Sequence, residues 1–114
     1  MHPAVNELVD QLGKEYGLDI NPSQLGVQRL DLGSKPDGKE ELVEAFIKAL
    51  KEAAPGDYLF VTHPDRDHPE SRAMSHKGYS IARYADLYLL TNSEVKETIQ
   101  ELKILLIPYT GLKE

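Results

Sequence analysis

The chain contains no cysteine among its 114 residues. Without thiols it forms neither disulfide bonds nor thiolate metal sites, so a cytoplasmic location is the default expectation. Long apolar runs are also missing. None approaches the ~20 residues that a membrane-spanning helix needs, and the N-terminus lacks the basic and apolar regions of a signal peptide.

An excess of basic charge is lacking too, because the formal net charge at pH 7 is −6. Proteins that bind DNA or anionic lipid through a broad surface gain most of their binding free energy by neutralising phosphates, so no nucleic-acid or membrane partner is expected. Hydrophobic residues make up 40% of the chain and charged residues 28%. This composition and length predict one folded domain spanning residues 1–114.

Four segments are predicted to be helices. Residues 3–16 carry one apolar stripe that we expect to be buried, with Gly17 placed as a C-terminal cap. Residues 39–53 are apolar on one face and charged on the other, and a shorter helix is expected over residues 80–90. The sequence "TNSE" then predicts a capping box, with Thr91 as cap and Glu94 reaching back, before a helix that directs Val95, Ile99 and Leu102 inward.

Three short runs have the composition of strands: "VQRLDL" (residues 27–32), "YLFV" (58–61) and "ILLIPY" (104–109). The last two are apolar on both sides, which is typical of strands inside a parallel sheet. Helices and strands therefore alternate, and the sequence predicts an α/β fold with a mainly parallel sheet.

The segment "YLFVTHPDRDHPESRAMSHKGY" (residues 58–79) holds three of the four histidines. His63 stands where the second strand ends, and in α/β folds the functional residues gather at the carboxyl ends of strands. Histidine there suits a general acid or base working near neutral pH. The alternative is that His63 only ends a strand and hydrogen-bonds a neighbouring backbone group. His76 is expected in a turn that Gly78 allows, and we assign it no role.

The same segment offers possible ligands for ions. His63, Asp65, Asp67 and His68 combine imidazole and carboxylate, as in Zn, Mn or Fe sites, although their spacing matches no motif of fixed geometry. A solvated polar loop is the competing interpretation.

Three arginines in and after this segment could bind a carboxylate or a hydroxyl-rich substrate through their planar guanidinium groups. They are Arg66, Arg72 and Arg83. The alternative is surface ion pairing, for example between Arg83 and Asp86 on one helix turn.

From "GDYLFV" to "YTGL" the chain resembles the C-terminal part of the YdjC-type carbohydrate deacetylases, also called the ChbG/HpnK-like family. The resemblance rests on a strand ending in the pair His63-Pro64, on "PESRA", on the pattern Arg83-x-x-Asp86-Leu87-x-x-Leu90-Thr91, on "SEVKETIQ" and on "ILLIPY". The opening "MHPAVNELVDQLGKEYGLDI" is similar to the family segment that follows its histidine-rich metal motif. The resemblance thus covers almost the whole chain.

The resemblance implies an irregular (β/α) barrel that removes acetyl groups from N-acetylated amino sugars or chitooligosaccharides with a divalent metal such as Mg or Zn. The family's metal ligands would lie upstream of Met1, and His2 does not reproduce them, so this chain would be a C-terminal half that is inactive alone. Such a half would associate with itself or with the missing N-terminal half.

The resemblance also implies roles for single residues. His63 would protonate the leaving amine, and Arg72 and Arg83 match positions where the family also carries arginine that would contact substrate. Asp65 and Arg66 have no family counterpart and are substrate-binding candidates only through their place in the loop.

Two other functions remain open. One is a complete small α/β domain that binds a ligand or protein through the surface from Asp65 to Arg83, without catalysis. The other is a small hydrolase whose metal is held by His63, Asp67 and His68.

Overall fold

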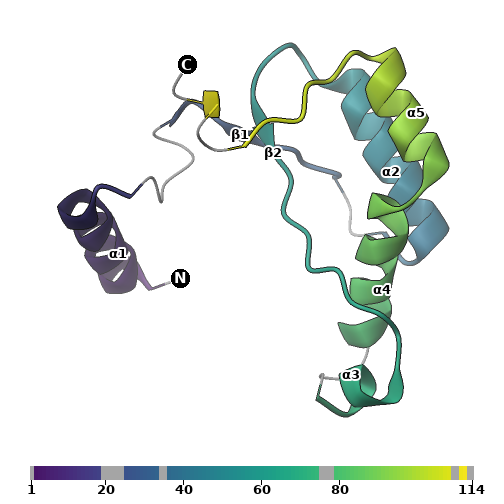
Figure 1. The fold of residues 1–114 in the computed structure, drawn as a ribbon, viewed down its shortest axis with the longest axis horizontal. Helices are drawn as coiled ribbons and strands as arrows, with labels where there is room; N and C mark the ends of the chain where they lie inside the picture. The colour runs from purple at the N-terminus through teal and green to yellow at the C-terminus, as the bar shows by residue number, and fades with distance from the viewer. Residues whose placement is uncertain (1, 19–24, 34–35, 75–78, 109–110, 113–114) are drawn as a thin grey trace. The chain divides into compact units, whose positions relative to one another are not determined.

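A computed structural model describes residues 2–18, 25–33, 36–74, 79–108 and 111–112. These residues form helices and a two-stranded sheet (Figure 1). Along the chain the elements are α1 (Pro3–Tyr16), β1 (Gln28–Arg29), α2 (Lys39–Glu52), β2 (Tyr58–Leu59), α3 (Pro69–Met74), α4 (Tyr79–Leu90) and α5 (Ser93–Glu101).

The chain divides into two compact units. One comprises Met1–Arg29, Gly56–Leu59 and Ile107–Glu114, and the other comprises Leu30–Pro55 and Phe60–Leu106. As far as the chain is described, no helix is both long and apolar enough to cross a lipid bilayer.

In the first unit, β1 and β2 pair in parallel, with Gln28 opposite Tyr58 and Arg29 opposite Leu59. This confirms the parallel pairing that the sequence predicts for these two segments, although each strand spans two residues. Helix α1 has the predicted bounds and ends at Gly17, whose left-handed φ of 65° suits glycine.

The apolar stripe of α1 was expected to be buried, and that expectation is wrong. Val5, Leu8, Val9 and Leu12 are all exposed, Leu8 by 53%. Periodicity identifies the apolar side of a helix, but burial depends on another element that covers this side.

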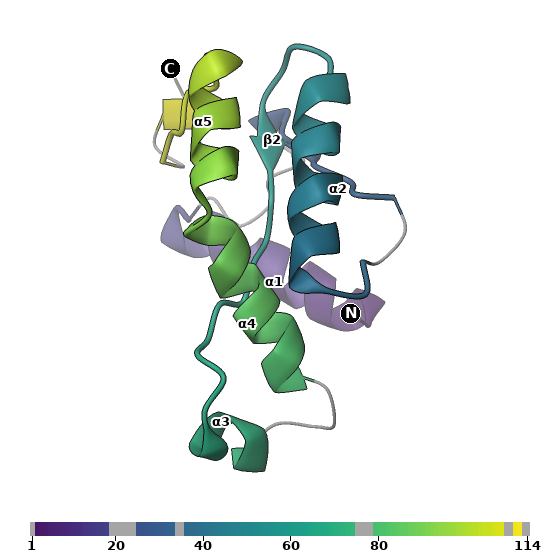
Figure 2. The ribbon, with the colours of Figure 1, turned by 90° about the vertical axis from the view of Figure 1, so that its right-hand side faces the viewer.

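The second unit has its core between α2 and the successive helices α4 and α5, which both contact α2 (Figure 2). Val43, Phe46 and Ile47 of α2 pack with Leu89 of α4 and Val95 of α5. Lys39, the first residue of α2, places its Nζ 5.6 Å from the ring centre of Tyr84 and 4.9 Å from that of Tyr88. These cation–π contacts join the start of α2 to α4.

The junction between α4 and α5 differs from the predicted capping box. Asn92, not Thr91, is the cap of α5, because its side chain accepts a hydrogen bond from the Val95 N–H over 3.1 Å. Thr91 still belongs to the end of α4, where both its N–H and its hydroxyl donate to the Leu87 carbonyl. Of the residues expected to point inward from α5, Val95 is buried, whereas Leu102 is exposed.

The strand predicted over residues 104–109 is absent from its described part, residues 104–108, and Tyr109 lies outside the described residues. Leu105 is 80% exposed and Leu106 is 77% exposed. An apolar run becomes an interior strand only when neighbouring strands and both covering layers are present, and residues 104–108 pair with no described strand.

Candidate functional site

The polar segment that follows β2 lies in the second unit and runs along α4 into α3 (Figure 1). Two hydrogen bonds connect it to α4. The His63 N–H donates to Asp86 Oδ2 over 2.9 Å, and the Asp65 N–H donates to the Arg83 carbonyl over 3.2 Å. The sequence predicted that a strand would hold His63, but β2 ends at Leu59 and the contact observed at His63 is with α4.

Helix α3 is formed by residues of the segment 58–79, for which the sequence predicts a loop. His68 caps it, since its Nδ1 accepts a hydrogen bond from the Ser71 N–H over 3.3 Å, and Pro69 occupies the first helical position. Proline at the first position and Glu70 in the first turn are helix-start signals that would have located α3 in the sequence. His2 caps α1 in the same way, with Nδ1 accepting from the Ala4 N–H over 3.3 Å and Pro3 next in the chain. Both imidazoles therefore act as acceptors for backbone groups.

Asp65 is the centre of a small hydrogen-bonded group. Its Oδ2 accepts from the Ser71 hydroxyl over 2.8 Å, and its Oδ1 accepts from the Arg66 N–H over 2.7 Å. These two hydrogen bonds, aided by the nearby charge of Arg83, hold the pKa of Asp65 below its ordinary value. Asp65 is therefore an ionised acceptor that joins the segment to α3.

Asp65, His68 and Ser71 are the residue types of a hydrolytic triad, but their arrangement differs from one. The Ser71 hydroxyl donates to the carboxylate and not to the imidazole, and Ser71 is only 6% exposed. His68 Nδ1 is already used as the α3 cap. A nucleophilic serine needs its hydroxyl proton directed at a base and access to substrate. The group therefore stabilises the loop.

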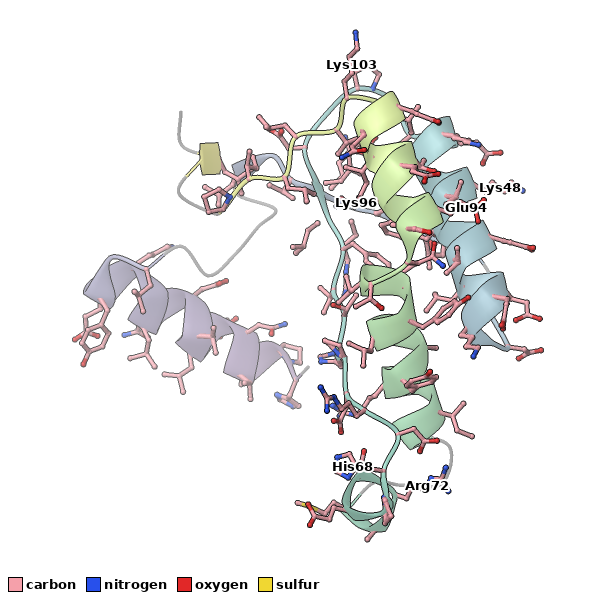
Figure 3. All side chains as sticks on the ribbon, turned by 45° about the vertical axis from the view of Figure 1, so that its right-hand side comes forward. Lys48, His68, Arg72, Glu94, Lys96 and Lys103 are labelled. Carbon is pink, nitrogen blue, oxygen red and sulfur yellow. The ribbon has the colours of Figure 1, made fainter. Side chains whose placement is uncertain are left out.

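Arg72 and Asp67 form a bidentate ion pair. Arg72 Nε lies 2.7 Å from Asp67 Oδ1, and Nη2 lies 2.6 Å from Oδ2. The carboxylate raises the pKa of Arg72 above its ordinary value. Arg72 lies on α3 together with its cap His68 (Figure 3), and its guanidinium is engaged within the chain. Asp67 occupies the Nε–Nη2 edge of the guanidinium, so a substrate group would bind the Nη1 side of Arg72 or replace Asp67.

The remaining candidates differ in their surroundings. Arg83 contributes its carbonyl and its charge to Asp65, and Arg66 contributes a backbone N–H while its side chain makes no ion pair with a described residue. No hydrogen bond joins the His63 imidazole to Asp65, Arg66 or Arg72 in the described chain. His76 and Gly78 lie outside the described residues.

The metal site suggested for His63, Asp67 and His68 is not assembled. Asp67 pairs with Arg72, and His68 caps α3. Within the described ranges, no three His, Asp or Glu side chains come together as ligands for a metal ion.

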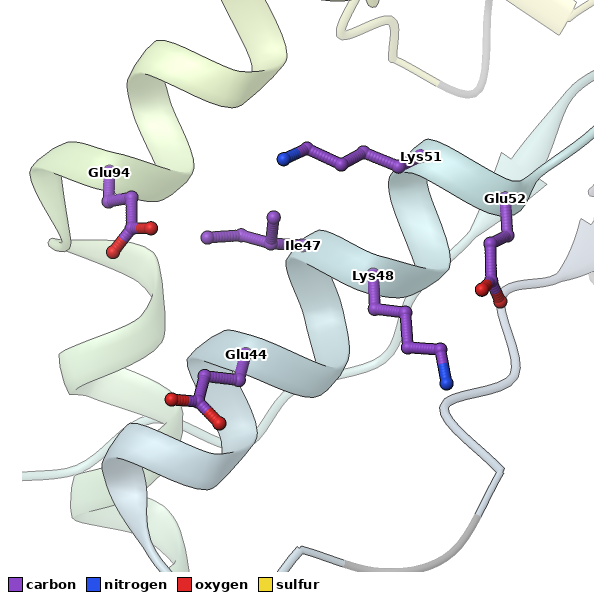
Figure 4. A pocket seen from close by; sticks show the side chains of 6 residues that line it. All are labelled: Glu44, Ile47, Lys48, Lys51, Glu52 and Glu94. Carbon is purple, nitrogen blue, oxygen red and sulfur yellow. The ribbon is translucent and has the colours of Figure 1, made fainter.

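A shallow groove of about 320 Å³ lies between α2 and α5. Figure 4 shows Ile47 and Lys51 of α2 directed toward α5, whereas Lys48 and Glu52 point away. Glu44 and Glu94 complete the lining. Acidic and basic side chains are both present here and do not converge on one point, so the groove has no polar centre of the kind that orients a small ligand.

Comparisons with protein-family models, with curated proteins and with solved structures gave no match for this chain.

Proposed function

We propose that the chain is the C-terminal part of a metal-dependent carbohydrate deacetylase that hydrolyses N-acetyl groups of amino sugars or chitooligosaccharides. One observation carries most of the support. Two parts of the resemblance, the pair His63-Pro64 and the segment Arg83-x-x-Asp86, are joined by the hydrogen bond from the His63 N–H to Asp86, 23 residues further along the chain. The motifs that suggest one active site thus meet in three dimensions.

In this proposal the His63 imidazole holds a proton and delivers it to the amine nitrogen as the amide C–N bond breaks. His63 is exposed and its side chain accepts or donates no hydrogen bond within the described chain, so it is accessible to a substrate. Arg72, Arg83, Asp65 and Arg66 are the residues proposed to contact the sugar. Arg72 would contact the sugar from the Nη1 side of its guanidinium, or after exchange of its Asp67 partner.

The proposed fold is an irregular (β/α) barrel completed by an N-terminal half. The β1–β2 pair supports this because two strands of two residues each are too few for a sheet that is stable on its own. The exposed Leu105 and Leu106 also support pairing with that half or with a second copy, since large exposed apolar side chains mark interaction surfaces. The divalent metal would be bound by upstream residues, and we assign no ligand to this chain.

The test compares the 114-residue chain with a longer version that includes an upstream Asp-Asp pair and a histidine-rich motif. With added divalent metal, we expect acetate release from an N-acetylated chitooligosaccharide by the longer protein and none by the shorter chain. His63→Ala in the longer protein should lower turnover by about 10²–10⁴-fold, the usual contribution of a general acid. His68→Asn is the matched control, because asparagine retains a helix-capping side chain.

Three outcomes would each contradict a part of the proposal. Retained turnover in His63→Ala would remove the acid role, and acetate release by the 114-residue chain would remove the division between two halves. An inactive longer protein would favour the alternative, a small α/β domain that binds a ligand or protein through the surface from Asp65 to Arg83, without catalysis.

A further inference from the structure

Within the second unit, the segment that carries His63 is attached to α2 and α4 through its residues Phe60, His63 and Asp65. Its first residue, Phe60, packs on Phe46 of α2, with ring centres 4.8 Å apart and planes inclined by 52°. The N–H groups of His63 and Asp65 then both donate to α4, one to the Asp86 carboxylate and the other to the Arg83 carbonyl. Of these anchors, only Asp86 contacts His63 itself.

Helix α4 is a rigid support for this contact. Ala85 and Leu89 lie one helical turn apart and are buried, and Leu89 has no exposed surface. Asp86 follows Ala85 directly, so its backbone is fixed by the residues that hold α4 in the core. A carboxylate acceptor binds an N–H more strongly than a neutral acceptor does.

We propose that Asp86 is a positioning residue. Its carboxylate holds the backbone of His63 against α4 and thereby determines the position of the imidazole. The inference rests on the proposed function in so far as His63 is the proton donor. It also gives the aspartate of the Arg83-x-x-Asp86 segment a role, because its carboxylate accepts a hydrogen bond from the loop backbone.

The hydrogen bond can be observed directly in the 114-residue chain by NMR. We expect a scalar coupling across the hydrogen bond between the His63 amide nitrogen and the Asp86 side-chain carbonyl carbon. In Asp86→Ala the coupling is lost, and the His63 amide exchanges with water about three- to tenfold faster. Asp86→Asn retains an acceptor oxygen and should restore most of the protection, whereas Glu97→Ala on α5 should leave His63 unchanged.

The signals of Leu89 and Val95 report whether each variant keeps its core. Absence of the coupling in the unmodified chain, or an unchanged His63 exchange rate in a folded Asp86→Ala variant, would overturn the inference. If Asp86→Ala does not fold, the presence or absence of the scalar coupling in the unmodified chain tests the inference. These readouts need no catalysis, so an inactive longer protein would overturn the proposed function and leave the positioning of His63 intact.

Discussion

The hydroxyl of Ser71 donates a hydrogen bond to Asp65 Oδ2 over 2.8 Å, and this contact joins the loop after β2 to α3. Ser71 is buried, so its hydroxyl has few alternatives to this carboxylate. Together with the Arg66 N–H on the other oxygen, it keeps Asp65 ionised and in place.

This arrangement makes the stability of the chain depend on the ionisation of Asp65. Because the folded-state pKa of Asp65 is lower than its ordinary value of about 3.9, the ionised form stabilises the fold. The contribution is fully present above about pH 4 and is lost as the pH falls through the folded-state pKa. We expect the stability difference between the unmodified chain and Asp65→Asn, measured by urea unfolding, to shrink as the pH falls below 4.

Ser71→Ala provides the partner experiment. Removing the hydroxyl should raise the pKa of Asp65 toward its ordinary value and move the acid-sensitive range to higher pH. An unchanged pKa of Asp65 in this variant, measured by NMR titration of its carboxyl carbon, would contradict the assigned cause.

The helices could be predicted from the sequence because their signals are local. The predicted range 39–53 compares with α2 at Lys39–Glu52, and the predicted range 80–90 compares with α4 at Tyr79–Leu90. Burial was less predictable. The stripe of α1 and the run 105–107 are apolar but exposed, since burial requires elements that periodicity in one segment does not specify.

The contacts of the polar site, like burial, depend on elements that local sequence signals do not specify. The sequence indicates which residues follow β2, but their observed partners depend on α3, which the apolar periodicity of the sequence does not predict. Asp67 and Arg72 are five residues apart, and Asp65 and Ser71 are six apart, so each pair meets only because α3 folds back. The contact between His63 and Asp86 depends in turn on the packing of α4.

The cap of α5 offers a direct test of one such difference. Asn92→Ala should destabilise the chain by about 0.5–2 kcal/mol, the usual cost of losing a capping side chain. Thr91→Ala should cost less, because the Thr91 hydroxyl donates to a carbonyl that already accepts the Thr91 N–H. The free energies of unfolding of both variants, measured by chemical denaturation, test this difference. A larger loss of stability for Thr91→Ala than for Asn92→Ala would support the capping box predicted from the sequence.

Neighbouring leucines at the end of α4 form a matched pair for the core. Leu89 is fully buried among residues of α2 and α5, whereas Leu90 is 54% exposed. We expect Leu89→Ala to lower the free energy of unfolding by about 2–5 kcal/mol, and Leu90→Ala to lower it by much less. Equal losses in urea unfolding would contradict the placement of the core.

The exposed apolar run 105–107 leads to the last prediction. In the isolated chain, Leu105→Lys should leave the urea midpoint almost unchanged, because the leucine side chain is already largely in water. If the run becomes a strand when the proposed N-terminal half is present, the same substitution should weaken association of the two halves, as measured by sedimentation. Met74→Lys is the control, since Met74 is also highly exposed but lies on α3. A large loss of stability in isolated Leu105→Lys would show that the run is already buried, whereas unaltered association would exclude it from the interface between the halves.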